Sequence, residues 1–145
     1  MNKFIKIWSI LIAVTFFVSC GSVGNLSKVK KTLVLPGRPQ AKAFVRYSGK
    51  LKTNKPVKIL KIRLIIDQTA VPAHNISVVN LNDGRIMNLN ELLPPGNYFI
   101  EVKLMDKSRF VSNNDKLIVK YKLKDNNKIY KFVQDVVDKN VVKSK

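Results

Sequence analysis

Cysteine, histidine and tryptophan each occur once in this chain of 145 residues, and nine acidic residues face 27 basic ones. A single cysteine excludes an intramolecular disulfide, so packing alone must hold the fold together. Zinc sites need three or four cysteine, histidine or carboxylate ligands, which this chain can hardly supply. The sequence also lacks a glycine-rich phosphate loop and a serine nucleophile motif.

The residues that could carry acid–base or metal chemistry are scattered. The lone histidine, His74, follows Pro72 closely and is interpreted as a loop residue. The run Asn113-Asn114-Asp115 lacks the spaced oxygen ligands of a calcium loop. No two of the other acids considered stand at a spacing that places them together: Asp67, Asp83, Glu91, Glu101 and Asp106. We therefore expect no enzyme, no cofactor and no metal.

A long apolar run is absent too. The longest candidate, residues 7–18, has twelve residues, whereas a membrane-spanning helix needs about 20. Lys3 and Lys6 precede this run, and Ser19 and Cys20 follow it. That order is typical of a cleaved secretory signal, and a thiol at the cleavage point can carry a thioether-linked lipid.

The segment Phe17-Val18-Ser19-Cys20 resembles a lipobox, the motif that lipoprotein signal peptidase cleaves. The usual motif has Leu, Val or Ile where this chain has Phe17, so it is similar to the relaxed lipoboxes of spirochaetal lipoproteins. The resemblance implies two or three acyl chains, such as palmitate, on Cys20, enough for stable membrane anchoring. Gly21, in place of an aspartate, implies the outer membrane or cell surface of the envelope over the inner membrane. The alternative is an ordinary signal peptide that happens to contain a cysteine.

The chain is expected to contain a signal peptide over 1–19, a lipidated flexible tether over 20–31 and one basic domain over 32–145. The tether assignment follows from the small, polar and basic residues there. Removal of residues 1–19 leaves 126 residues, enough for one domain.

Basic residues are unevenly distributed. After removal of the signal, 25 basic and nine acidic residues remain, a formal charge of +16. Residues 21–66 contain no acid, which predicts attraction to polyanions. An AT-rich genome that favours lysine codons is the other explanation. The twelve basic residues of that stretch are Lys28, Lys30, Lys31, Arg38, Lys42, Arg46, Lys50, Lys52, Lys55, Lys58, Lys61 and Arg63.

Period-two hydrophobicity predicts strands over 60–66, 98–104 and 117–123, with a shorter one over 42–47. Turn-forming residues separate the apolar segments at Asp83-Gly84, Pro94-Pro95-Gly96-Asn97 and Asp125-Asn126-Asn127. Together these patterns predict an all-β fold, an antiparallel β-sandwich or small barrel of about seven strands. Residues 129–142 are ambiguous. We expect a strand to about Gln134 and then a short helical tail.

The segment Leu92-Leu-Pro-Pro-Gly-Asn-Tyr-Phe-Ile-Glu-Val102 resembles the turn and strand of small bacterial envelope β-sandwiches, including carboxypeptidase-regulatory-like and PEGA-type domains. Tyr130-Lys131-Phe132 matches a late strand of the same layout, so the resemblance covers about residues 60–133. It supports the sandwich but carries no catalytic residues and implies no function.

Two predicted strands place their basic residues on one face, Lys61 and Arg63 on the first and Lys120, Lys122 and Lys124 on the second. If these strands are neighbours, they form a candidate anion-binding surface. Otherwise the lysines are simply solvated. The partners expected are the membrane, through lipid on Cys20, and an anionic glycan, lipid headgroup or envelope protein. Export and the lack of interleaved aromatics argue against nucleic acid. The alternative function is a structural accessory lipoprotein of an envelope assembly.

Overall fold

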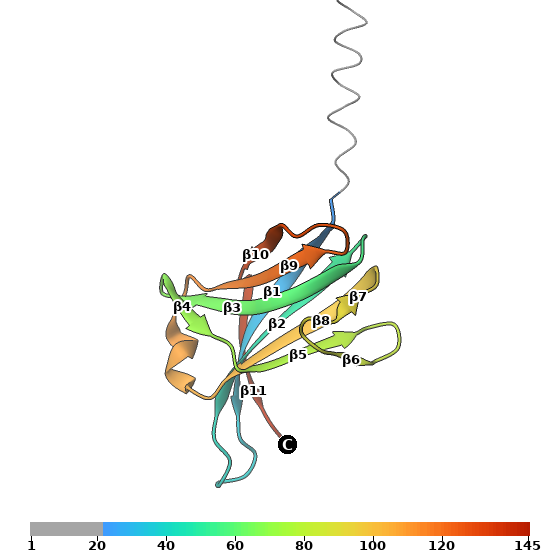
Figure 1. Cartoon of the computed structure of the whole chain (residues 1–145). Helices are drawn as coiled ribbons and strands as arrows, with labels where there is room; N and C mark the ends of the chain where they lie inside the picture. Colours follow the sequence, from blue (N-terminus) through green and yellow to red (C-terminus); the bar gives the residue numbers. More distant parts are fainter. Residues whose placement is uncertain (1–21) are drawn as a thin grey trace, which may run out of the picture.

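The structure, a computed structural model, describes residues 22–145. The predicted signal peptide and Cys20 lie outside the described residues. Within them, eleven strands and one 3-10 turn follow one another along the chain (Figure 1). The elements are β1 (Gly24–Leu35), β2 (Phe44–Thr53), β3 (Val57–Ile66), β4 (Thr69–Pro72), β5 (Asn75–Asn80), β6 (Ile86–Met87), β7 (Leu92–Leu93), β8 (Gly96–Leu104), η1 (Lys107–Val111), β9 (Lys116–Leu123), β10 (Ile129–Asp135) and β11 (Asp138–Lys143).

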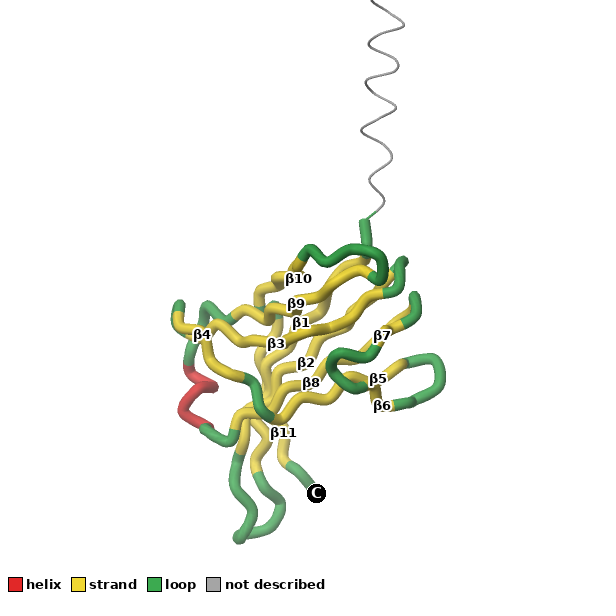
Figure 2. Tube along the Cα trace, in the orientation of Figure 1, coloured by secondary structure: helices red, strands yellow, loops and turns green. Residues whose placement is uncertain are grey.

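The strands form two sheets, as the yellow traces of Figure 2 show. One sheet, here called sheet A, has the order β11-β1-β2-β8-β5-β6, and the other, sheet B, has the order β10-β9-β3-β4 with β7 also paired to β3. All pairings are antiparallel except that of β1 with β11. Neither sheet closes on itself, so the predicted all-β sandwich is confirmed and the small barrel is not formed.

Alternating apolar residues from both sheets fill the space between them. Sheet A contributes Tyr47 and Ile100, while sheet B contributes Ile62 and Val119, and all four are at most 1% exposed. These residues come from the period-two segments of the sequence, whose other face is polar. Every described strand pairs with another inside 22–145, and the core cluster runs from Leu26 to Tyr121. We therefore expect residues 22–145 to fold without residues 1–21.

The predicted flexible tether is wrong over residues 24–31, because β1 begins at Gly24 and lies in sheet A between β2 and the edge strand β11. Its ladder with β2 uses backbone groups, which small and polar residues provide as well as apolar ones. Gly24 is needed there, since a Cβ at this position would clash with the carbonyl oxygen of Lys52. A register shift after Ser27, with Lys28 at φ 52°, interrupts the alternation and conceals the strand in the sequence.

The predicted helical tail is also wrong. The strand that was expected to reach about Gln134 is β10, and it ends at Asp135. The chain then crosses to sheet A, where β11 pairs with β1 in parallel, from Lys30↔Asp138 to Leu35↔Lys143. Val136, Val137 and Val141 fitted a helical spacing, but Val136 and Val137 lie between the two strands and Val141 lies in β11, where β-branched side chains are suited to an edge strand.

The predicted turns connect the strands that the sequence indicated. Asp83-Gly84 joins β5 to β6, and residues 125–127 join β9 to β10. Pro94 and Pro95 lie between β7 and β8, where the Tyr98 hydroxyl donates a hydrogen bond to the carbonyl of Pro94. Within residues 22–145, no helix has the length and hydropathy to cross a bilayer.

Candidate functional site

The outward face of sheet B carries a group of cations, here called the basic face: Lys58, Lys61, Arg63, Lys120, Lys122 and Lys131. Strands β3 and β9 are neighbours, as the candidate surface required. On both strands the cations alternate with buried residues such as Ile62 and Val119, so they point away from the core.

Three lysines of the basic face form one row across three strands. Lys61 is the cross-strand partner of Lys120, and Lys120 is the partner of Lys131. Directly opposed residues have Cβ atoms about 5 Å apart, and like charges at that separation are destabilising. A second row joins Lys58 to Lys122. The sheet therefore holds like charges close together, an arrangement that lowers the stability of the fold unless the charges are neutralised.

Counter-ions for these cations are absent among residues 22–145. None of the six forms an ion pair there. By contrast, Lys116 of β9 pairs with Asp135 of β10 at 3.7 Å. The basic face thus has unneutralised positive charge, which is the electrostatic requirement for binding a polyanion.

The structure places the predicted residues in three positions. Lys61, Lys120 and Lys122 lie in the two cross-strand rows. Arg63 is on the same face but opposite Ile118, and Lys124 lies beyond the end of β9, in the turn toward β10.

Sequence reasoning missed Lys131, which completes the row. The signal was present, because Lys131 sits between Tyr130 and Phe132, whose rings stack on Tyr121 at centroid distances of 5.7 and 4.3 Å. Two inward aromatic residues at period two require that the residue between them points outward. This stacking fixes β10 against β9 and so fixes the row.

A hollow of about 760 Å³ adjoins the basic face at the end of β9 and β10 nearer η1. Its lining combines apolar side chains, Ile65, Ile118 and Val133, with the cation Lys131 and the paired Asp135. No group of three or more His, Cys, Asp or Glu side chains within residues 22–145 is placed to hold a metal ion.

A second polar constellation lies buried at the same end of the sandwich. Lys31 Nζ donates to Asp115 Oδ2 at 2.6 Å, to Ser112 Oγ at 2.7 Å and to the Ser112 carbonyl at 3.0 Å. The Tyr47 hydroxyl donates to Asp115 Oδ2 at 2.7 Å. Ser112 Oγ donates to the same carboxylate, with oxygen distances of 2.6 and 2.8 Å. Lys31 and Asp115 were not predicted to meet, because Lys31 was assigned to the tether.

The pKa shifts of this group have identifiable causes. Burial raises the pKa of the Asp115 carboxyl, but hydrogen bonds from Lys31, Ser112 and Tyr47 outweigh burial and lower it overall. Burial lowers the pKa of Lys31, against the opposing effect of Asp115. Burial and the Asp115 carboxylate raise the pKa of the Tyr47 hydroxyl. The geometry is that of a buried ion pair whose hydrogen bonds are satisfied.

This buried group is suited to holding the fold and not to proton transfer. All three protons of Lys31 are used, and no buried side-chain nitrogen or oxygen among the described residues lacks a partner. It connects β1 and β2 to the segment between η1 and β9. His74, exposed in the loop after β4, lies in another part of the molecule and joins no such group.

Comparison of the chain with protein-family models, with curated proteins and with solved structures finds no match.

Proposed function

We propose that this chain is a lipid-anchored protein of the bacterial envelope whose β-sandwich is a non-catalytic module for binding an anionic polymer or lipid. The lipid is carried by Cys20, on the basis of the lipobox-like segment before it. The outer membrane or cell surface is the proposed destination. The binding surface is the basic face of sheet B.

The observation that carries the binding proposal is the row of Lys61, Lys120 and Lys131. Its members are in cross-strand register and have no acidic partner among residues 22–145. Sheets usually place opposite charges or neutral pairs at such positions, because opposed like charges cost stability. A bound polyanion would neutralise the row and remove that cost.

The test is retention of residues 22–145 on heparin and on anionic vesicles while salt rises from about 50 to about 500 mM. Binding that weakens steeply with salt supports the proposal, and retention that does not change with salt refutes it. The double variant Lys120→Glu/Lys131→Glu should elute at lower salt than the chain with Lys107→Glu/Lys145→Glu, which carries the same charge change on residues outside the face.

The lipid anchor needs a separate test. Cells producing the full chain are labelled with a radioactive fatty acid, and the purified protein should carry the label. The Cys20→Ala variant should carry none. Fatty-acid label on the Cys20→Ala variant would refute the lipid anchor. A parent chain that is exported and cleaved but carries no label would refute it as well.

The structural accessory function is favoured by a different surface. β11 is the edge strand of sheet A, all six of its residues are exposed, and Val141 and Val142 are 55% and 40% exposed. Edge strands with apolar side chains are suited to pairing with another protein. Crosslinking in cells from a photoreactive residue at Val142 should then recover one stoichiometric envelope protein, whereas recovery of none would refute this function.

A further inference from the structure

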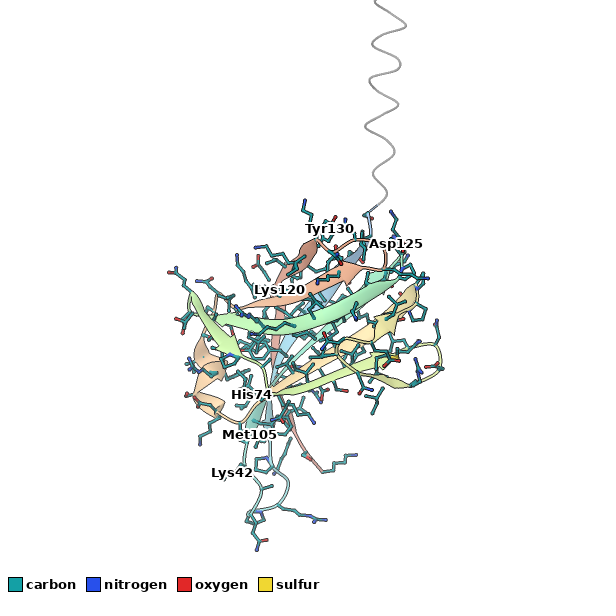
Figure 3. The ribbon with its side chains drawn as sticks, in the orientation of Figure 1. Lys42, His74, Met105, Lys120, Asp125 and Tyr130 are labelled. Atoms are coloured by element: carbon teal, nitrogen blue, oxygen red, sulfur yellow. The ribbon has the colours of Figure 1, made fainter. Side chains whose placement is uncertain are left out.

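The six lysines at the end of the sandwich that contains Ser22 carry the further inference. This end, here called the proximal end, holds the start of β1, the β2–β3 turn and the β9–β10 turn. Figure 3 shows Asp125 and Tyr130 there, with Lys42 and Met105 at the opposite end. The proximal lysines are Lys52, Lys55, Lys58, Lys122, Lys124 and Lys128.

The chain is fixed to the proximal end as it enters the fold. Asn54 in the β2–β3 turn donates its backbone N–H to the Val23 carbonyl at 2.7 Å and its side-chain amide to the Ser22 carbonyl at 3.1 Å. Two further residues of chain can span at most about 7 Å. Cys20 is therefore covalently confined to the neighbourhood of the β2–β3 turn, which carries Lys55.

Four of the proximal lysines line two hollows. One, of about 310 Å³, is lined by Lys58, Lys122 and Lys124 together with Leu92, which is 41% exposed. The other, of about 240 Å³, shares Lys124 and adds Lys55. Both hollows combine lysine ammonium groups with apolar surface, because Leu123 lines each of them.

Negative charge at this end is small. Asp125 lines the second hollow, Asp83 lies in the β5–β6 turn near Tyr98, and Glu91, on the segment before β7, is already paired with Arg85 at 3.1 Å. None of the proximal lysines forms an ion pair within residues 22–145. The Lys128 ammonium lies over the ring of Tyr130, 5.5 Å from the ring centroid. This contact does not neutralise its positive charge as a carboxylate would.

We propose that the proximal lysines bind the anionic headgroups of the membrane in which Cys20 is anchored, so that the sandwich sits on the bilayer by this end. The inference rests on the proposed lipid anchor at Cys20 and assigns the membrane to a second surface, which shares Lys58 and Lys122 with the basic face. A basic cluster this close to an acyl anchor acts with it, since electrostatic attraction reaches about 10 Å at ordinary salt. Leu92 would contact the apolar part of the headgroup region.

The first experiment uses residues 22–145, which lack Cys20 and so report the lysines alone. Binding is measured by sedimentation with phosphatidylcholine vesicles, with and without about 30 mol% phosphatidylglycerol. We expect roughly tenfold or greater preference for the anionic vesicles. Equal binding to both vesicles overturns the inference.

The second experiment compares two triple variants of equal charge change. Lys55→Glu/Lys124→Glu/Lys128→Glu alters exposed loop positions of the proximal end, and Arg38→Glu/Lys42→Glu/Lys145→Glu alters exposed positions elsewhere. The proximal variant should lose roughly tenfold or more of its vesicle binding, and the second variant about threefold or less. Equal losses in the two variants overturn the inference, because net charge alone would then explain binding.

Heparin retention of the same samples separates the two proposals. Binding to heparin without binding to anionic vesicles leaves the binding module standing and refutes the lipid ligand. Binding to neither refutes both. For the full lipidated chain in vesicles, amine acylation followed by mass spectrometry should show Lys124 protected relative to detergent and Lys42 unchanged. Equal labelling of Lys124 in both conditions refutes the docked orientation.

Discussion

Lys31 and Asp115 are 84 positions apart in the chain, yet Nζ of the lysine lies 2.6 Å from Oδ2 of the aspartate and both side chains are 1% exposed. The pair connects the first strand of sheet A to the start of β9 in sheet B. Because both charges are out of water, each is tolerated only while the other is present.

Replacing one partner of the pair should destabilise the protein strongly. Asp115→Ala leaves the Lys31 ammonium buried without its counter-ion, which costs about 3–5 kcal/mol of unfolding free energy. The double variant Lys31→Met/Asp115→Leu removes both charges and should be more stable than Asp115→Ala. Urea denaturation checks this order, and a double variant less stable than Asp115→Ala would contradict it.

Tyr47→Phe provides a milder probe of the same group. It deletes one hydrogen bond to a buried carboxylate and should lower the free energy of unfolding by about 1.5–3 kcal/mol. Tyr130→Phe is the matched control, because its hydroxyl accepts a hydrogen bond from Asn126 in an exposed position. Chemical denaturation of both variants should show a clear loss for Tyr47 alone; similar losses would contradict the assignment.

The lowered pKa of Asp115 predicts acid sensitivity. Below about pH 4 the unfolded carboxyl binds a proton more readily than the folded one, so stability falls as pH decreases through the folded pKa. The effect should be smaller in Asp115→Asn, whose side chain does not titrate. Unfolding free energies at pH 7 and pH 3 measure it. If Asp115→Asn is too unstable to measure, Tyr47→Phe and Ser112→Ala provide the test. Each removes a hydrogen bond to the Asp115 carboxylate, so each should lose less stability between pH 7 and pH 3 than the parent chain. Parallel pH curves for all variants would refute the prediction.

Lys131→Glu should weaken the binding of heparin and stabilise the fold. It places an acid opposite Lys120 and should raise the free energy of unfolding by about 0.2–1 kcal/mol, because an opposite-charge pair replaces a like-charge pair. The same variant should elute from heparin at lower salt. Lys107→Glu, on η1 away from the row, is the control for net charge. A Lys131 variant that is less stable than that control would show that the row carries no repulsion.

The sequence predicted those strands whose two faces differ. Residues 60–66, 98–104 and 117–123 alternate clearly because one face is in the core and the other is in water. β1 was missed because its small polar residues and its register shift interrupt the alternation, and β11 because its valines also fit a helical spacing. Lys31, the one buried cation of residues 22–145, could not be recognised before β1 was.

The candidate site was predictable in part for a similar reason. Local alternation indicates which residues share a face, so Lys61, Lys120 and Lys122 were selected correctly as outward residues of neighbouring strands. Cross-strand register depends on contacts between distant segments, and no local pattern gives it. The Lys31–Asp115 pair and the row that includes Lys131 are both consequences of register.

The parallel pairing of β1 with β11 determines when the protein can finish folding. Thr32 of β1 and Asn140 of β11 are 108 positions apart and joined by a hydrogen bond of 2.6 Å. The outer edge of β1 is therefore covered only when β11 has been made and has paired with it. Until then the newly made protein presents an open edge of sheet A to chaperones, proteases and other chains.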